Sequence, residues 1–541
     1  MEGHRQYDFH EYVPHAALAT IVFGGAGALL VAYGVGLAVY RLCLSPIAGF
    51  PGPRLAALSL WYEFYYDVVC GGRYWAKIDE LHDRYGPIIR INPHELHVRD
   101  PDFYDLLYAG PTSGQRRDKW AWSVNMFANS QSGFGTVPHD LHRQRRAALN
   151  PFFSKQAITQ RVEPQIRDLL TQMCARFEKL KGTGEVLNVI EAYAALTTDV
   201  ITRYAFDASY GCVGDPDWRA EWPRAMVEGT KTCHLNKQFP WVVPLMRAVP
   251  EGVVGMLNPA VLQLINFQKD LARQITAIMH ETKDSKADQT RDPPERPPTI
   301  FHELISNESL PPEEKSLQRL ADEGQTLIAA GQETTSFHLQ TVTYHVLANP
   351  AIHARLRAEL RDEVADVMTA SVAGLERLPY LRAVVQEGHR FAHGVMGRLQ
   401  RISPDAPLHY HDRQHNVGKD WVIPAGTPVS MTAPLQHRDP AKFLHPHVFD
   451  PARWLVGPSA SSAEEVAALE RYLVPFSKGT RHCLGINLAT AEIYLTLAAV
   501  FGNKKFGMGL YETCARDAEA VRDYFIPHGH ADSKGVRVVF N

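Results

Sequence analysis

The chain of 541 residues is long enough for several domains, so composition and motif order must decide its class. Its 56 Lys and Arg residues nearly balance its 59 Asp and Glu residues, which leaves no positive charge that would indicate a nucleic-acid partner. The seven cysteines are odd in number, lie far apart and include no C-x-x-C pair, which argues against a disulfide framework and a zinc site, and for a reducing compartment.

The first expected element is a helix that crosses a membrane. Residues 16–40 contain no Asp, Glu, Lys, Arg or His, and roughly 20 apolar residues suffice to span the hydrocarbon core. Acidic residues outnumber basic ones in residues 1–15, unlike the positive start of a cleaved signal peptide. Arg41 and Arg54 follow the apolar run, whereas only Arg5 precedes it, so the positive-inside rule places the bulk of the chain in the cytosol. We expect a luminal leader at 1–15 and a transmembrane anchor at 16–40.

Residues 41–54 contain three prolines and two glycines. Proline lacks an N–H and clashes with the preceding helical turn, so this stretch cannot continue the helix. We expect a stiff hinge at 41–54 and one catalytic domain at 55–541, although an ordinary loop would have much the same composition.

The expected domain is mainly α with a small β region. Apolar residues spaced by three and four predict helices over 162–180 and 352–368. Short strand-like runs occur at 88–91, 408–411 and 536–540. Residues 283–298 are polar and contain four prolines, which predicts a surface loop.

The strongest chemical signal is the run from Phe476 to Gly485, which reads F-S-K-G-T-R-H-C-L-G. A cysteine that binds a metal as a thiolate needs a loop of unusual backbone geometry, and Gly479 and Gly485 allow it. Backbone N–H groups of the loop and the start of a following helix both stabilise the thiolate charge. A lone cysteine in a glycine-rich turn would usually be structural, but Phe476 and Arg481 at these offsets favour Cys483 as a metal ligand.

A second motif, A-G-Q-E-T-T, lies at residues 330–335 inside a long helical pattern over 314–347. A glycine such as Gly331 destabilises a helix interior by about 1 kcal/mol relative to alanine, so its presence needs an explanation. The missing side chain leaves room for a diatomic ligand, and Glu333 and Thr334 could pass protons toward it. Alone, the motif could equally be a helix with a packing glycine; the cysteine motif favours the functional interpretation.

A third pattern pairs Glu387 with Arg390, which share one face of a helix. On its own this would be a surface ion pair of little weight. Downstream, Arg453 in the run F-D-P-A-R-W supplies a second guanidinium, whose fork suits a carboxylate.

Together these motifs resemble those of the cytochrome P450 superfamily, which carries F-x-x-G-x-R-x-C-x-G, A-G-x-[ED]-T-[TS], E-x-x-R and P-x-R-[WF] in this order. The resemblance covers nearly the whole chain and implies the mainly α fold of that superfamily, after one transmembrane helix. It also implies haem b with Cys483 as the axial ligand, and thiolate ligation favours O–O cleavage. The implied roles are space for dioxygen at Gly331, proton delivery by Glu333 and Thr334, and a structural triad of Glu387, Arg390 and Arg453.

The resemblance extends to residues expected at the haem propionates. Many members have W-x-x-x-R where this chain has His142 and Arg146, so histidine replaces the usual tryptophan. Arg398 and Arg481 are further candidates. The basic cluster around Arg146 could also be a solvated helix face.

The implied reaction inserts one oxygen atom from O₂ into a substrate by hydroxylation or epoxidation. The sequence shows no flavin or NADPH module, so electrons from NADPH should come from a separate reductase of the NADPH–cytochrome P450 type, docked on a basic face of Arg143, Arg145, Lys155 and Lys478. A haem-thiolate isomerase or dehydratase, and a haem protein without catalytic activity, are the alternatives. We expect the protein at the endoplasmic reticulum with its catalytic domain in the cytosol.

The substrate pocket is expected to be mostly apolar. Three segments, 126–138, 327–334 and 394–399, should line it with Met126, Phe127, Phe134, Leu327, Ile328, Val395 and Met396, plus the polar Asn125, Asn129, Ser130, Gln131 and Ser132. Such a pocket suits a compact apolar molecule. The stretches 139–155 and 472–489 resemble members from secondary metabolism of filamentous fungi. We therefore predict a terpenoid substrate, with a polyketide or a prenylated alkaloid as the alternative.

Overall fold

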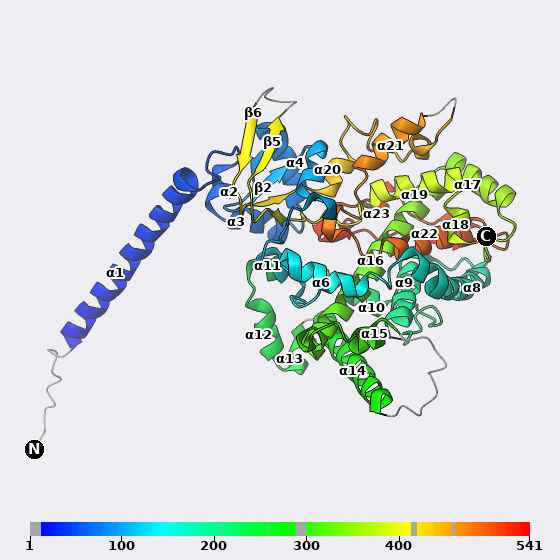
Figure 1. Ribbon diagram of the computed structural model, residues 1–541, viewed down its shortest axis with the longest axis horizontal. Helices are drawn as coiled ribbons and strands as arrows, with labels where there is room; N and C mark the ends of the chain where they lie inside the picture. Colours follow the sequence, from blue (N-terminus) through cyan, green and yellow to red (C-terminus); the bar gives the residue numbers. More distant parts are fainter. Residues whose placement is uncertain (1–11, 207, 258, 288–298, 413–418, 458–460) are drawn as a thin grey trace, which may run out of the picture.

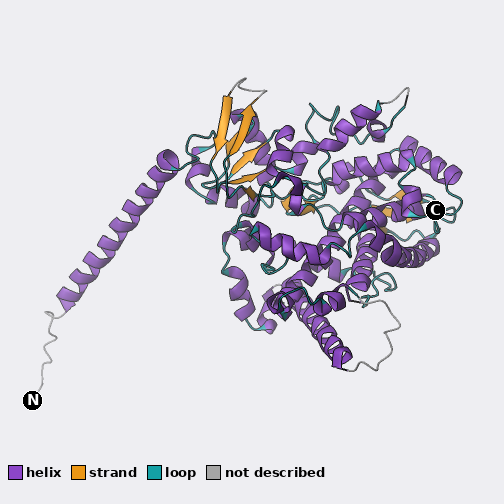
Figure 2. Cartoon of the chain, viewed as in Figure 1, coloured by secondary structure: helices purple, strands orange, loops and turns teal. Residues whose placement is uncertain are grey.

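The computed structural model describes residues 12–206, 208–257, 259–287, 299–412, 419–457 and 461–541. Helices make up most of one large body, from which α1 (Tyr12–Val39) projects as a rod (Figure 1). The hairpin of β5 (Leu408–Asp412) and β6 (Lys419–Ile423) stands on the side where α1 joins the body (Figure 2). The expected mainly α fold with a small β region is confirmed.

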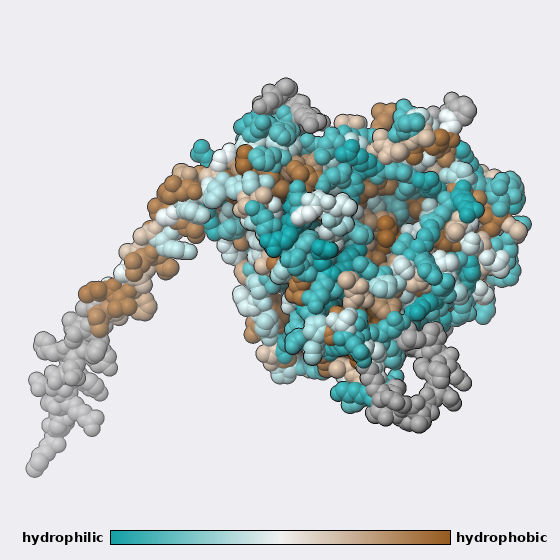
Figure 3. Space-filling view, viewed as in Figure 1, coloured by the Kyte–Doolittle hydropathy of each residue, from teal (hydrophilic) through white to brown (hydrophobic). Residues whose placement is uncertain are grey.

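The helix α1 carries the apolar run that was expected to cross a membrane. The stretch Leu18–Leu44, which ends in a π-helical turn at Tyr40–Leu44, is long and apolar enough to span a bilayer by length and composition. The side chains of residues 18–36 are exposed, and hydrophobic residues recur along the surface of the helix (Figure 3). The apolar side chains of such a helix are not buried against the rest of the chain, so they are available to contact lipid, as an anchor requires. Residues 1–11 of the expected leader lie outside the described residues.

The expected hinge at 41–54 is fastened to the body. The Arg41 guanidinium donates to the Leu58 carbonyl oxygen, and Arg90 donates to the Arg41 carbonyl oxygen at 2.6 Å. Ile47 is buried. A Cβ at Gly52 would collide with the Arg90 carbonyl oxygen, so this close approach explains the glycine. The segment is therefore an attached strap at the base of the anchor.

The core is organised around the long helix α16 (Leu317–Ala348). It packs against α9 (Val189–Phe206), α14 (Pro259–Ala287), α19 (Pro379–Ala392) and α22 (Ile486–Phe501). The helix begins at Leu317 rather than at residue 314 because Pro312–Lys315 forms a 3-10 turn and Ser316 is extended. Most of its side chains are buried, so the A-G-Q-E-T-T motif lies at the centre of the molecule.

Other predicted helices match with shifted ends. The pattern at 162–180 is confirmed as α8 (Glu163–Leu180). The pattern at 352–368 forms α17 (Pro350–Glu363), which stops earlier because Val364 has an extended backbone. The loop predicted from residue 283 was wrong at its start, since α14 continues to Ala287 through residues that contain no proline or glycine; residues 288–298 lie outside the described residues.

The strands form small sheets. The first has the order β1 (Ile88–Arg90), β2 (Leu96–Val98), β7 (Pro428–Ser430) and β4 (Arg401–Ile402), with only the β2–β7 pair parallel. A second joins β3 (Leu187–Asn188), β11 (Arg537–Phe540) and β8 (Met508–Leu510), and a third pairs β9 (Arg522–Tyr524) with β10 (Ile526–His528). The predicted strands at 88–91, 408–411 and 536–540 are confirmed as β1, β5 and β11.

Shorter helices complete the body. On the side of the anchor lie α2 (Arg54–Leu58), α3 (Trp61–Phe64) and α4 (Tyr74–Tyr85). Below them in Figure 1 lie α11 (Cys233–Gln238), α12 (Val242–Ala248) and α13 (Glu251–Leu257), whereas α10 (Glu221–Thr230) lies nearer the middle of the body. The helix α6 (His139–Leu149) crosses beside them.

Candidate active site

The cysteine loop is built as the sequence motif requires. Gly479 has a φ of +77°, and a Cβ there would collide with the carbonyl oxygens of Tyr108 and Ala109, so only glycine fits. The Cys483 N–H donates to the Phe476 carbonyl oxygen at 2.8 Å, which closes the loop. The helix α22 begins at Ile486, directly after the loop, as expected. Cys483 therefore lies at the positive end of a helix dipole.

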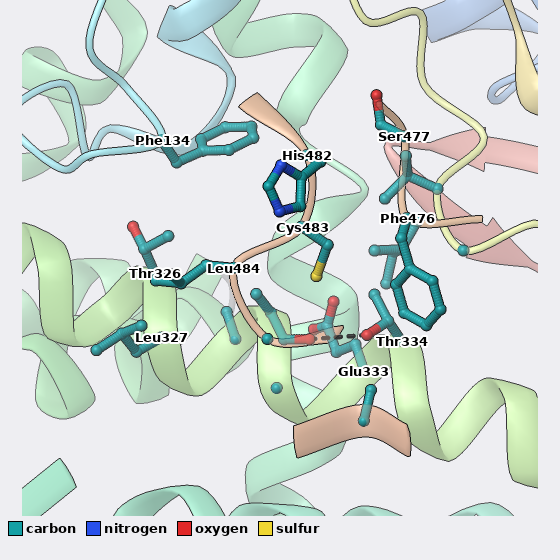
Figure 4. A pocket seen from close by; sticks show the side chains of 18 of the residues that line it. Phe134, Thr326, Leu327, Glu333, Thr334, Phe476, Ser477, His482, Cys483 and Leu484 are labelled. Carbon is teal, nitrogen blue, oxygen red and sulfur yellow. Dashed lines mark hydrogen bonds between the residues drawn. The ribbon is translucent and has the colours of Figure 1, made fainter. Parts of the chain in front are cut away.

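The Cys483 thiol faces a cavity between its loop and α16. Figure 4 shows the sulfur pointing toward α16, with Glu333 and Thr334 on the facing side. Burial raises the pKa of the Cys483 thiol, and the Gly485 amide and the Arg146 guanidinium oppose that rise. A bound metal cation would supply the missing stabilisation of the thiolate.

The cavity has a volume of about 370 Å³ and mostly apolar walls. Gly331, Glu333 and Thr334 all line it, on the opposite side from Cys483. A Cβ at Gly331 would lie 3.4 Å from the Ile201 side chain on α9, which is an ordinary van der Waals contact. The packing of α16 on α9 therefore does not require a glycine at this position.

The carboxyl group of Glu333 is buried, and burial raises its pKa to about 8. Within the described residues its Oε1 atom has no hydrogen-bond partner. The Thr334 hydroxyl donates to the Ala330 carbonyl oxygen at 2.9 Å. Glu333 therefore holds a proton at neutral pH, and the neighbouring Thr334 has a lone pair toward the cavity.

Three buried cations, Lys119, Arg401 and Arg481, line one side of the cavity. Burial lowers the pKa of each, to about 9 for Arg481, and repulsion among them adds to the shift for Lys119 and Arg481. In the part of the chain that the structure describes, none of the three forms a salt bridge with an acidic side chain. Their visible partners are backbone carbonyl oxygens, such as Thr136 and Val137 for Arg481. Asp118 attracts Arg481 without forming a salt bridge, so this cationic arc is suited to anions from outside the chain.

These observations fit a haem group. A thiol at the positive end of a helix, a mostly apolar cavity between that thiol and α16, and cations without a salt bridge to an acidic side chain would suit a thiolate-bound iron and two propionates. Arg481 was expected in this role, Arg401 was not, and Lys119 was not expected at the cavity. Lys119 lies in a loop and Arg401 in the short strand β4, and neither belongs to one of the sequence motifs.

The structure corrects the expectation for Arg398. This residue does not line the cavity; its guanidinium forms salt bridges with Glu63 and, at 3.4 Å, with Glu95. Arg401, three residues later in β4, lines the cavity instead. The strand-like pattern after Arg398 could not show that its guanidinium would form a salt bridge with Glu63, which is far away in the sequence.

His142 and Arg146 both line the cavity from α6. Burial, aided by Arg481, lowers the pKa of His142 to about 2, so its imidazole is neutral. Its Nδ1 atom has no hydrogen-bond partner among the described residues. Arg146 donates to the His482 carbonyl oxygen at 2.6 Å, so it also fastens the cysteine loop. The cluster is therefore not a fully solvated helix face.

The expected triad is assembled around one buried carboxylate. Glu387 accepts hydrogen bonds from Arg390 at 2.7 Å, from Arg453 at 3.2 Å and from the Trp454 indole at 2.9 Å. Arg390 also donates to the His437 carbonyl oxygen at 3.0 Å. The carboxylate is fully desolvated but saturated with donors, so it ties α19 to the segment that precedes the cysteine loop.

The predicted pocket residues divide into two groups. Phe127, Asn129, Phe134, Leu327 and Val395 line the cavity. The remainder do not, and of these Met126, Ile328 and Met396 pack into apolar clusters behind the wall. The other residues in this group are Asn125, Ser130, Gln131 and Ser132. The sequence indicated the three segments, but it did not show which side chains of an irregular loop face the cavity.

Sequence reasoning missed other residues of the wall. The turn between β9 and β10 contributes Phe525, and the adjoining Ile526 also lines the cavity; α10 contributes Thr230. Buried polar groups at the cavity edge include His338, His389 and Glu492. Glu492 could have been noticed, because it is the one carboxyl group in the apolar stretch 486–501.

The expected docking face is only partly available. Arg145 is engaged with Glu314 at 2.8 Å, and both side chains are mostly buried. Lys155 pairs with Glu376, while Arg143 is exposed. The fourth residue, Lys478, pairs with Asp105. Arg145 therefore belongs to the fold of this region rather than to a free basic surface.

Comparisons with known proteins agree with this geometry. The Cytochrome P450 family model matches residues 51–509. Cytochrome P450 monooxygenase MO6277 of Ascocoryne sarcoides is 42% identical over 536 residues, which are 98% of this chain and 99% of the relative. Tryptophan 6-hydroxylase fscE of Fusarium equiseti is 43% identical, covering 93% and 94% of the two chains. N-acetyltryptophan 6-hydroxylase ivoC of Emericella nidulans is 42% identical, covering 94% and 95%.

A solved structure shows the same fold. The cytochrome P450DA heme domain superposes with a TM-score of 0.64 at 16% identity, covering 88% of this chain and 94% of the other. The family match spans the cysteine loop, the A-G-Q-E-T-T helix and the triad. The chain is therefore a member of the cytochrome P450 family, similar to fungal monooxygenases over nearly its whole length.

Proposed function

We propose that this protein is a membrane-anchored haem-thiolate monooxygenase that inserts one oxygen atom from O₂ into a small, mainly apolar substrate. The observation that carries the proposal is the Cys483 thiol, which faces Glu333 and Thr334 across a cavity that an unpaired cationic arc closes on one side. An iron porphyrin held there by a thiolate supplies the chemistry that cleaves dioxygen.

The residues of the chain would provide binding, position and protons. Cys483 would hold the iron, and Arg481, Arg401, His142 and Arg146 would lie around the carboxylates of the cofactor. Glu333 would hold a proton in the buried wall, and Thr334 would direct it toward the cavity. The apolar lining would keep bulk water away from the reacting atoms.

Glu333 and Thr334 also argue against the alternative functions. An isomerase or dehydratase needs no supply of external protons, and a haem carrier needs no acid beside its cavity. A carboxyl group that is buried and protonated at neutral pH costs stability, so its place beside Thr334 favours a proton-consuming reaction.

We further propose that electrons come from NADPH through a separate membrane-bound flavoprotein reductase. The helix α1 supports a membrane location, and the positive residues after it support an endoplasmic-reticulum protein with the body in the cytosol. The domain limits proposed from the sequence are a leader at 1–15, an anchor at 16–40, a hinge at 41–54 and a catalytic domain at 55–541.

The substrate of this chain is proposed to belong to fungal secondary metabolism, with a terpenoid as the prediction from the sequence. One structural feature favours an aromatic compound as a second candidate. Phe127, Phe134 and Phe525 form a cluster on the cavity wall with ring centroids 5.3 to 6.1 Å apart. Two relatives are named as hydroxylases of tryptophan and N-acetyltryptophan, which supports the same class.

One experiment tests the proposal as a whole. The purified protein is combined with haem, a P450 reductase and NADPH, and oxygen uptake is measured with and without candidate substrates. A monooxygenase should consume oxygen in step with substrate and give a product heavier by one oxygen atom. Conversion of an oxygenated substrate without NADPH would indicate an isomerase, and binding without turnover would indicate a carrier.

A further inference from the structure

Lys119 occupies the border between the cationic arc and the substrate side of the cavity. Its Nζ atom lies 3.5 Å from the centre of the Phe134 ring and donates to the Phe134 carbonyl oxygen. The side chain is 9% exposed and lines the cavity. A cation held over an aromatic ring retains donors for an anion, because an ammonium group has three N–H bonds.

The number of cations exceeds the number of carboxylates that the cofactor supplies. Lys119, Arg401 and Arg481 face the cavity without acidic partners in the described part of the chain, whereas haem b has two propionates. Arg481 is oriented by the Thr136 and Val137 carbonyl oxygens, and Arg401 extends from β4 over the Tyr108 ring. Lys119 is the cation that touches a phenylalanine of the substrate wall, so it is the one placed to meet a third carboxylate.

The surrounding wall is aromatic. Phe525 stands edge-on to both Phe127 and Phe134, at 5.3 Å from each ring centre. Edge-to-face arrangements of this kind leave room for a flat ring to join the cluster. Because Lys119 lies on Phe134, a ring seated against the cluster would bring a short acidic side arm within reach of the ammonium group.

We propose that Lys119 is a specificity-determining residue that binds a substrate carboxylate, and that the substrates are aromatic acids with a short side arm. This inference rests on the proposed monooxygenase function and names the substrate class of the same site. A salt bridge in a water-excluded cavity selects an acid over its neutral amide, because the amide leaves the buried ammonium group unpaired.

The test compares matched pairs of probes on the haem-loaded, full-length protein. Indole-3-propionate and N-acetyltryptophan are titrated beside their neutral amides, and Kd is read from the shift of the haem from low to high spin. The native protein should bind each acid at least about tenfold more tightly than its amide. Lys119→Met should remove that preference and leave the affinity for the amides unchanged, and Lys119→Arg should restore much of it. Lys155→Met, at an exposed pair with Glu376, is the matched control and should change nothing.

The outcomes separate this inference from the function on which it rests. If the native protein bound the amides as tightly as the acids, the inference would be overturned while the monooxygenase function stood. If Lys119→Met lost haem during gel filtration, Lys119 would serve a propionate and the inference would again fail. A protein that took up no haem at all would contradict the proposed function itself.

Discussion

The Lys237 ammonium group on α11 lies 2.6 Å from the Glu63 carboxylate on α3, although the two side chains are 1% and 0% exposed. Asp67 lies 3.5 Å from the same ammonium group, and Arg398 contacts the same oxygen atom of Glu63 as Lys237 does. This buried ion cluster joins α11 to the first helices after the anchor. Cys233, one turn earlier on α11, packs on Met126 and Tyr524 directly behind the aromatic wall. The cluster therefore holds the wall of the cavity in place.

Lys237→Met should lower the free energy of unfolding by about 3–5 kcal/mol, because it removes one of the two buried cations that face Glu63 and Asp67. The double variant Glu63→Gln, Lys237→Met should lose less than the sum of the two single variants. Urea unfolding measures the free energy of unfolding of the two single variants and of the double variant. Lys269→Met, in an exposed pair with Glu251, should lose only about 0–1 kcal/mol. Strictly additive losses would show that the two residues do not act as a pair.

Glu387→Gln should destabilise the protein and accelerate the loss of haem. The carboxylate receives the donors of Arg390, Arg453 and Trp454, and an amide cannot accept them all. We expect a loss of about 3–5 kcal/mol and faster transfer of haem to apomyoglobin. Glu470→Gln, which breaks a surface pair with Arg382, is the control and should behave as the native protein does. Equal behaviour of the two variants would contradict the role of the triad.

The Thr334→Ala variant should bind haem normally, but its NADPH oxidation should be poorly coupled to product formation. The reason is that the variant lacks the hydroxyl that directs protons into the cavity. Hydrogen peroxide formed per NADPH should rise while product falls. Thr341→Ala is a matched control, because this buried threonine makes the same bond to the carbonyl oxygen four residues earlier. If both variants kept the coupling of the native protein, Thr334 would be a packing residue.

Glu333 should make stability depend on pH. Its pKa rises from 4.5 to about 8 on folding because the carboxyl group is buried. The folded protein therefore binds an extra proton between these values, so this contribution is fully present below pH 4.5 and is lost as the pH rises through 8. The loss is up to about 5 kcal/mol. Glu333→Gln should flatten the fall in unfolding free energy over this range, and an unchanged slope would contradict the assignment.

Removal of residues 1–39 should release the protein from tight membrane integration and leave the body intact, because α1 packs on nothing in the described chain. Removal of residues 1–53 should lower the melting temperature, since it also removes Ile47 and the contacts of Arg41. Carbonate extraction and thermal unfolding measure the two effects. Trp241, just before α12, and Leu245 on α12 are exposed, so some peripheral membrane affinity should persist in the shorter protein.

The sequence predicted local features well. Cys483, Glu333 and Thr334 lie in continuous motifs whose spacing imposes geometry, and the structure places all three around one cavity. The long helices followed from apolar periodicity, and their ends shifted where one residue, such as Val364, left the helical conformation.

Features that depend on distant partners could not be predicted. In the sequence, Arg398 and Arg401 are equally plausible residues to bind the cofactor. Arg398 does not line the cavity because it forms a salt bridge with the distant Glu63. The same holds for Phe525, which reaches the cavity because the β9–β10 turn packs beside Met396. Pairings across hundreds of residues have no periodic signature.

The central claim is that Cys483 binds the haem iron as a thiolate, and the spectrum of the reduced, carbon-monoxide-bound protein tests it most directly. The native protein and Cys514→Ala, which alters an exposed cysteine, should both show the strongly red-shifted Soret band of thiolate ligation. Cys483→Ala should lose that band. A red-shifted band that persisted in Cys483→Ala would contradict the account.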